Sequence, residues 1–280
     1  MENIYSSLLY SLIDSNLEEF NDRTKMRVRM LDGGFGFKLC LKDGFLPNFN
    51  VRKIYPYIAG VETAWQLSGK KNAEWINKKA PKLWTKFTDK DGTIPGAYGY
   101  RWRSAFGRDQ ISMTINELRY NYTTRQLYIS AWDPCADGLG AAQKKNIPCP
   151  VGFSVYRYEN YLNGSVFLRS SDAFVGLPYD VLNYSLLFDA LASSCGCKVN
   201  ILTFTLANVH VYGSHFKTIK EGLFCYEDTK NLYKESETKL PNWSVEKIVQ
   251  FKDEYVATVK NLSKTYNNNI FWNPRPEVVL

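Results

Sequence analysis

The stretch "PCPVGFSVYRYENYLNGSVFLRSSDAFVGLPYD", residues 148–180, carries much of the pattern that decides the fold. Apolar and polar side chains alternate over 151–172, which predicts two strands around a turn at Asn163-Gly164. A helix is expected over 179–196, with Asp180 in the N-cap position. The prolines that flank Cys149 suit the start of a strand. A cysteine held there is either a small buried hydrophobe or an exposed nucleophile.

The remaining elements give an α+β chain that we treat as one domain over residues 1–280. Helical periodicity predicts helices over 2–15, 57–69 and 109–121. Two strands around Gly33-Gly34 are expected in 26–41, another strand over 125–132, and one long strand over 198–213. The last 45 residues show weaker strand signals.

Composition limits the classes of function. The chain has 280 residues, is 45% hydrophobic and carries a net charge of +7, which suits nucleic acid or a small anionic substrate. The N-terminus is acidic, and no apolar run approaches the roughly 20 residues of a membrane span. We therefore expect a cytoplasmic protein, in the host cytoplasm if the chain is viral. Six cysteines without a C-x-x-C pair, and only two histidines, predict no metal site.

Two further polar groups stand out. Arg169, Ser170 and Asp172 follow a predicted strand, where an arginine beside hydroxyls suits an oxyanion or a phosphate. The alternative is a loop whose charges cap the next helix. His210 and Tyr212 share one strand face and can hold a sugar hydroxyl, or form a satisfied interior pair.

In this order the motifs resemble the thymidylate synthase superfamily. Each segment is weak alone, and together they are specific. The similar segments are "NDRT" (21–24), "VETAWQL" (61–67), "AYGYRWR" (97–103), "TTRQLYISAW" (123–132), "PCP" (148–150), "LRSSDAFVGLPYD" (168–180) and "VHVYGSH" (209–215).

The resemblance implies a large mixed sheet flanked by helices, in a homodimer packed sheet to sheet. It also implies 5,10-methylenetetrahydrofolate as co-substrate, with no metal. Residues with catalytic roles would be Cys149 as nucleophile, Glu62, Tyr98 and Asp172. The nucleotide would be bound by Arg23, Arg169, Ser170, Asp180, His210, Tyr212 and Arg125 of the partner subunit. The folate would be bound by Arg52, Trp84, Asp172 and Gly176. Arg169 and the borrowed arginine are expected to favour the thiolate of Cys149.

Departures from the family pattern point to the substrate. Asp180 replaces the usual asparagine; a carboxyl group accepts from the cytosine N4 amino group and shares a proton with N3. Pro150 replaces a histidine that orders water, and Gln126 replaces a second arginine. Segments 81–84, 96–102 and 209–216 look more like phage-type deoxycytidylate hydroxymethylases. We therefore expect C5 hydroxymethylation of dCMP, in a virus that modifies its DNA.

Other outcomes stay open at this point. The enzymes to compare are a dUMP hydroxymethylase, a thymidylate synthase and a dCMP methyltransferase. They differ in whether water or a hydride reaches the methylene carbon, and sequence does not report that positioning. A non-catalytic RNA- or nucleotide-binding relative is disfavoured because Cys149, Glu62 and the phosphate-binding residues are all present. The expected reaction requires no nucleic acid and no membrane.

Overall fold

The segment that follows Cys149 forms the central hairpin of the molecule. The computed structural model describes residues 2–120, 124–140, 147–232, 237–266, 270, 272–274 and 276–279. Strand β5 (Pro150–Tyr158) pairs antiparallel with β6 (Tyr161–Leu168), so the two predicted strands are confirmed. The predicted turn position is wrong, because the turn falls at Glu159 and Asn160. Gly164 lies inside β6, where a Cβ would come within 2.1 Å of the Phe188 ring; the glycine gives room to a helix.

Two mixed sheets make up the β structure. The larger has the order β3-β8-β6-β5-β4, with β6 and β8 parallel. Its other strands are β3 (Phe35–Cys40), β4 (Tyr128–Ser130) and β8 (Lys198–Leu206). The smaller has the order β1-β2-β9-β7, made of β1 (Glu18–Asn21), β2 (Met26–Met30), β7 (Ser171–Asp172) and β9 (Val209–Tyr212).

Two strand predictions need correction, because each covered residues that belong to different sheets. The long strand expected over 198–213 is interrupted at Ala207 and Asn208, and its halves β8 and β9 join different sheets. Likewise, the two strands around Gly33-Gly34 exist, but β2 and β3 do not pair with each other. The predicted α+β class, with mixed sheets flanked by helices, is confirmed.

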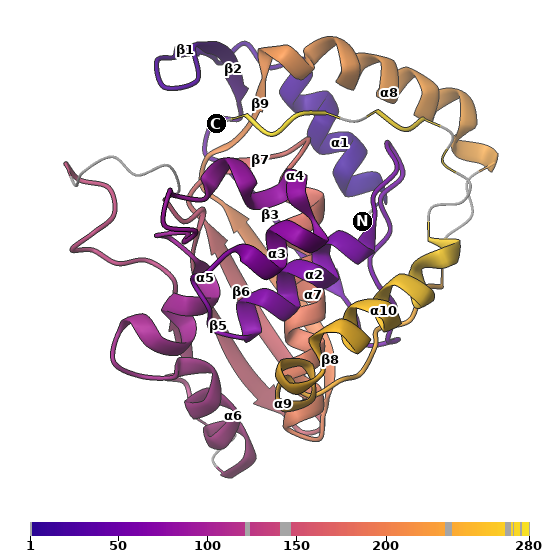
Figure 1. Ribbon diagram of the computed structural model, residues 1–280. Coiled ribbons are helices and arrows are strands. Elements are labelled where there is room, and N and C mark those ends of the chain that lie inside the picture. The colour runs from indigo at the N-terminus through magenta and orange to yellow at the C-terminus, as the bar shows by residue number, and fades with distance from the viewer. Residues whose placement is uncertain are drawn as a thin grey trace.

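Helices cover one face of the larger sheet (Figure 1). Helix α7 contacts β6 and β8, and α2 and α9 pack against α7. None of the helices in the described ranges is long and apolar enough to cross a membrane. The helices are α1 (Glu2–Ile13), α2 (Pro56–Leu67), α3 (Glu74–Lys79), α4 (Pro81–Trp84), α5 (Tyr98–Tyr100), α6 (Gln110–Tyr120), α7 (Leu177–Ser194), α8 (Phe216–Thr229), α9 (Val245–Gln250) and α10 (Lys252–Leu262).

The predicted helices are present, with α6 ending at Tyr120 and Asn121 outside the described residues. Helix α8 and strand β1 were not predicted. The strand signals of the last 45 residues are wrong over 245–262, which form α9 and α10. Ser244 caps α9 by accepting from the Lys247 amide, a helix-start signal that the apolar content of this region obscured.

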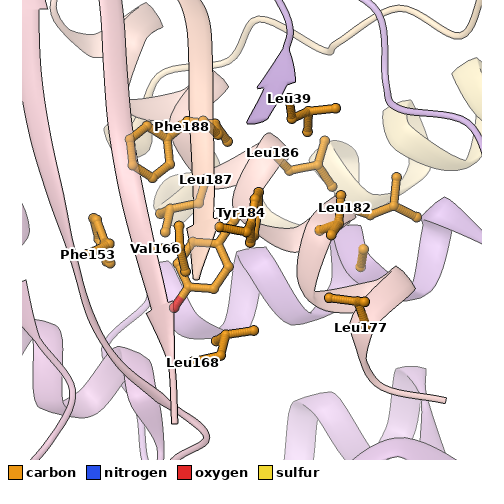
Figure 2. Close-up of a cluster of buried hydrophobic side chains, with 14 of the residues drawn as sticks. Leu39, Phe153, Val166, Leu168, Leu177, Leu182, Tyr184, Leu186, Leu187 and Phe188 are labelled. Carbon is orange, nitrogen blue, oxygen red and sulfur yellow. The ribbon is translucent and has the colours of Figure 1, made fainter. Parts of the chain in front are cut away.

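The core lies between α7 and the inward face of the larger sheet. Figure 2 shows side chains of α7, among them Leu182, Tyr184 and Phe188, gathered with Phe153 and Val166 of the hairpin. Burial of such a side chain stabilises the fold by roughly 1.5–3 kcal/mol. Because α2 and α9 enclose α7 on its other sides, nearly all of that helix is buried. The core therefore fixes α2 and α7 against each other.

The outward face of the same sheet is exposed and aromatic. Alternation places every second side chain of β5, β6 and β8 on this face. Contiguous apolar patches on a protein surface are candidates for interaction surfaces. We call the large exposed side chains of this face the outer-face patch: Tyr128, Tyr156, Tyr158, Tyr161, Phe167 and Ile201.

Candidate active site

The half-buried Cys149 lies just before β5, at the end of the central hairpin. Its carbonyl accepts a hydrogen bond from the Arg169 amide at 2.9 Å, which continues the ladder past β6. The Arg169 side chain turns back onto the same segment: Nε donates to the carbonyl of Pro148 at 2.9 Å, and Nη2 to that of Ile147 at 3.1 Å. Its guanidinium also lies 5.6 Å from the Trp132 ring centroid. Arg169 therefore fixes the backbone that presents the thiol.

Burial and charge act on Cys149 in opposite directions. Burial, followed by the charge of Asp180, raises the pKa of the Cys149 thiol to about 11, against the opposing effects of Arg169 and Arg23. The charge of Arg169 favours the thiolate, as expected, and so does that of Arg23, but burial and Asp180 have the larger effect on the pKa. Arg125 is exposed on the segment that leads into edge strand β4. Within one chain, Arg169 thus favours the thiolate as expected, but burial and Asp180 outweigh it and keep the thiol protonated near neutral pH; the contribution of the partner's Arg125 stays a prediction.

The smaller sheet brings the Arg-Ser-Asp segment to the histidine strand. Asp172 pairs in register with His210, and its Oδ1 accepts from the amides of Phe174 and Val175 at 3.0 and 3.1 Å. The rings of His210 and Tyr212 lie 5.0 Å apart at 86°, which confirms that they share a strand face. Burial lowers the pKa of His210 despite the nearby Asp172, so the imidazole is neutral at pH 7.

Arg23 joins this group from the turn between β1 and β2. Asn21 closes the turn by accepting from the amide and hydroxyl of Thr24 at 3.0 and 3.2 Å. Although Arg23 is exposed, its charge opposes the burial that raises the pKa values of Cys149 and Tyr212. Ser170 is half-buried, next in the chain to Arg169. The predicted phosphate-binding residues of the chain itself thus gather near the thiol, and Arg125 does not join them.

Two carboxyl groups form the other side of the site. Glu62 of α2 is 7% exposed, and its Oε1 accepts from Trp84 Nε1 at 3.2 Å and Gln66 Nε2 at 3.3 Å. Burial and the charge of Asp180 raise the pKa of Glu62 to about 8. Burial, then the charge of Asp172, raises the pKa of Asp180 to about 7. Both acids therefore titrate near neutral pH.

Asp180 is not a helix cap. Helix α7 begins at Leu177, with Gly176 before it, so Asp180 lies inside the first turn. Among the described residues, no side chain caps the start of α7 by a hydrogen bond. The N-cap interpretation is wrong, because Pro178 starts the helix earlier than the sequence pattern indicated.

The Tyr-Gly signature sets Tyr98 between these two sides. Its ring packs edge-on against Trp84 at 5.6 Å, and burial, followed by Cys149 and Asp180, raises its pKa well above the usual value. A Cβ on Gly99 would lie 1.9 Å from the Gln66 carbonyl oxygen, so only glycine allows α5 to approach α2 this closely. A π-helical turn (Arg101–Ala105) follows.

The predicted folate-binding residues occupy mixed positions. Arg52 is 3% exposed, and its Nε and Nη2 donate to the Phe174 carbonyl at 3.0 and 2.7 Å. It thus supports the turn before α7 from behind instead of presenting a free guanidinium. Trp84 uses its indole N–H to hold Glu62. Gly176 lies between Asp172 and Asp180, where a Cβ would make only ordinary contacts.

Several residues of the site were missed from the sequence. Tyr184 lies near Asp180, Glu62 and Cys149, and its buried hydroxyl has no hydrogen-bond partner among the described residues. Thr63, Gln66 and Asn183 connect α2 to α7 behind Glu62. The available signal was the presence of uncharged polar residues within otherwise apolar helical segments.

The arrangement places a thiol near two carboxyl groups that titrate near neutral pH. An activated thiol can form a covalent intermediate, and acids that titrate near neutrality suit general acid–base catalysis. The unpartnered Tyr184 hydroxyl and the Asp180 carboxyl group fit a polar ligand such as a nucleotide base. Among the described residues, no group of three or more metal-ligating side chains could hold a metal ion.

Comparison with known proteins agrees with this chemistry. The family model "Thymidylate synthase" matches residues 3–261. The thymidylate synthase of Francisella tularensis subsp. holarctica (strain LVS) is 30% identical over 214 residues, which cover 72% of this chain and 77% of that protein. The thymidylate synthase of Francisella philomiragia subsp. philomiragia is 29% identical over 201 residues, 68% of this chain and 73% of that protein. The chain therefore belongs to the thymidylate synthase family, whose enzymes transfer a one-carbon unit from methylenetetrahydrofolate to a nucleotide.

Proposed function

We propose that the protein hydroxymethylates dCMP at C5, using 5,10-methylenetetrahydrofolate and water. The observation that carries this proposal is Asp180, a carboxyl group in the first turn of α7 whose pKa is raised to about 7. It stands near Cys149, as its charge on the thiol indicates. The position therefore suits a group that reads the base while the thiol attacks it.

Cytosine matches such an acid better than uracil does. A neutral carboxyl group can donate its O–H to cytosine N3 and accept from the N4 amino group. N3 is a basic ring nitrogen that can share the proton, whereas the O4 of uracil is a weakly basic carbonyl oxygen. Because the pKa of Asp180 is raised by burial, its protonated form is available near neutral pH.

The thiol of Cys149 would add to C6 of the pyrimidine, which makes C5 nucleophilic. The co-substrate supplies the one-carbon unit that C5 accepts. Arg23, Arg169 and Ser170 would bind the phosphate by charge-assisted and hydroxyl hydrogen bonds. His210 and Tyr212 would hold the ribose 3′-hydroxyl, and Glu62 would exchange protons with the base through water.

The outcome at the one-carbon unit separates hydroxymethylation from methylation. Addition of water to an exocyclic methylene group at C5 gives a hydroxymethyl group and leaves tetrahydrofolate unchanged in oxidation state. Transfer of a hydride instead gives a methyl group and dihydrofolate. Pro150 is part of the basis for the first outcome, because it replaces a histidine that orders water in the family, so the water beside Cys149 should be arranged differently. Tyr98 and Asp172 are proposed to act at C5 and at the folate, with Trp84 and Gly176 nearby.

A homodimer would complete the site. The outer-face patch is an apolar surface on the larger sheet, and it suits a second copy of the chain packed sheet to sheet. Arg125 is exposed beside edge strand β4 of this same sheet. In a dimer its charge could reach the partner's thiol and oppose the burial that raises the pKa of Cys149.

The test is to identify the product. Purified protein is incubated with methylenetetrahydrofolate and either dCMP or dUMP, with Cys149→Ser as the matched inactive control. The proposal expects dCMP heavier by CH₂O and no absorbance of dihydrofolate. A product heavier by CH₂, with dihydrofolate formed, would make the enzyme a methylase; CH₂O on dUMP alone would make it a dUMP hydroxymethylase.

The second candidate is dUMP methylation, which is the activity that the names of the Francisella relatives describe. Release of tritium from dCMP labelled at C5 decides whether any attack occurs on cytosine. Release from dUMP only would favour the second candidate. Binding of nucleotide without release from either base would favour the non-catalytic alternative.

A further inference from the structure

A row of buried polar side chains lies behind Glu62, between α2 and α7. Thr63 Oγ1 donates to Asn183 Oδ1 at 2.6 Å, Asn183 Nδ2 to Gln66 Oε1 at 2.9 Å, and Gln66 Nε2 to Glu62 Oε1 at 3.3 Å. Thr63, Gln66 and Asn183 are at most 2% exposed. Burial of an amide costs free energy of folding unless the amide is hydrogen-bonded. The hydrogen bonds of the row are therefore needed for these side chains to be buried between the two helices.

The hydrogen bonds of this row can run in either direction. The Thr63 hydroxyl has one proton but two neighbouring acceptors, the Ala59 carbonyl at 2.9 Å and Asn183 Oδ1 at 2.6 Å. If the Asn183 amide makes a half-turn, Thr63 donates to Ala59 and accepts from Asn183 Nδ2. The two ends of an amide are nearly the same size, so the half-turn leaves the heavy atoms in place. If Gln66 turns with it, its Oε1 faces Glu62.

We infer that Thr63, Gln66 and Asn183 form a reversible hydrogen-bond row that positions Glu62 in both of its protonation states. When Glu62 is ionised, Gln66 Nε2 donates to it; when Glu62 is neutral, its O–H donates to Gln66 Oε1. No proton moves along the row, and only the direction of its hydrogen bonds changes. The inference rests on the proposed function, in which Glu62 gains and loses a proton.

The surroundings of Glu62 make both states accessible. The titratable groups that face it are Asp180 and Tyr184 on α7 and Tyr98 on α5. Burial and Asp180 raise the pKa of Glu62 to about 8, while burial keeps both tyrosines neutral. Trp84 donates to Glu62 in either state. A fixed donor at position 66 would satisfy the ionised state alone, whereas an amide satisfies both.

Steady-state kinetics across pH test the row. Gln66→Met keeps the length of the side chain and removes its hydrogen bonds. It should lower kcat about 10- to 100-fold with little change in the KM for the nucleotide. The limb of the kcat profile that reports Glu62 should move to higher pH, because the ionised form loses the stronger hydrogen bond. Thr63→Val should change both quantities in the same direction but less, and Thr63→Ser should restore them.

The matched control is another buried amide, outside the row. Asn163 in β6 accepts from Asn200 Nδ2 at 2.9 Å and from the Ile201 amide at 3.3 Å. Asn163→Leu should lower Tm and leave the pH limb in place. If Gln66→Met and Thr63→Val also lower Tm while kcat and the limb stay at wild-type values, the row only packs the helices and the inference is overturned.

A second measurement does not depend on turnover. Infrared titration of the ligand-free protein follows the protonated carboxyl band of Glu62, which Glu62→Gln assigns. Gln66→Met should move the midpoint of this band to higher pH, and an unchanged midpoint overturns the inference. If the wild-type protein converts no pyrimidine nucleotide, the proposed function is wrong. The infrared midpoint still shows whether the row affects the protonation of Glu62.

Discussion

The two sides of the site are built by different means. On the thiol side, defined by Cys149, Arg169 and Arg23, strand pairing and backbone carbonyls set the positions, and two cations are present. On the acid side, defined by Glu62 and Asp180, two packed helices hold carboxyl groups whose pKa values are raised by burial. Within one chain, both carboxyl groups therefore titrate near neutral pH, whereas the pKa of Cys149 is raised to about 11 and its thiol stays neutral.

The thiol side should fail most severely when its sulfur is replaced. Cys149→Ser is expected to lower turnover by several orders of magnitude, because a neutral serine hydroxyl is a much weaker nucleophile than a thiolate. The nucleotide should still bind, since the arginines remain. Stopped-flow turnover and calorimetric binding measure the two effects. A variant with wild-type turnover would exclude the covalent mechanism.

The incomplete charge on the thiol side leads to a complementation experiment. Cys149→Ser and Arg125→Ala are each expected to be inactive as homodimers. Equal mixing with subunit exchange should restore about a quarter of the wild-type activity, because half of the dimers are mixed and each has one intact site. Differently tagged chains verify the exchange. Exchange without recovery would show that Arg125 completes no partner site.

The acid side should govern which base is used. Asp180→Asn presents an amide in place of a proton-sharing acid, which suits uracil and mispairs cytosine. Two mispaired contacts, at about 1–3 kcal/mol each, predict a change on the order of 10²-fold or more in relative kcat/KM. Measurement of kcat/KM for dCMP and dUMP in both proteins checks the ratio. A ratio equal to that of the wild type would remove the main support for dCMP.

The smallest expected effect is on stability. Folding raises the pKa of Asp180 from 3.8 to about 7 and that of Glu62 from 4.5 to about 8. The folded protein therefore binds these protons more tightly than the unfolded chain does. Their contribution to stability is present below the unfolded values and is lost as pH rises through about 7 and 8. Asp180→Asn should thus raise Tm, and calorimetry should find a larger rise at about pH 8 than at about pH 5. A gain independent of pH would contradict the raised pKa.

Sequence reasoning worked where a pattern is local. Alternation gave the hairpin strands and the shared face of His210 and Tyr212, since side chains in a strand have a period of two. It misplaced the turn at Gly164 because the partner of that glycine, Phe188, lies in a distant helix. It also merged β8 with β9, because apolar alternation continues across a change of sheet.

The site was predictable for residues within compact motifs and unpredictable for those that depend on distant contacts. The Gln66–Asn183 hydrogen bond joins residues 117 positions apart, and neither carries a charge that draws attention in a sequence. The balance of charge at Cys149 also needs three dimensions, because burial and Asp180 together outweigh the arginines that the motifs display.

The close approach at Gly99 has a consequence for engineering. With a Cβ at this position only 1.9 Å from the Gln66 carbonyl oxygen, no other amino acid can stand there without separating α5 from α2. A variant library made to change the substrate range should keep Gly99 in the segment 97–103 and place its substitutions at the start of α7. At Gly176, directly before α7, an added Cβ would make only ordinary contacts, so the backbone does not exclude a side chain there as it does at Gly99.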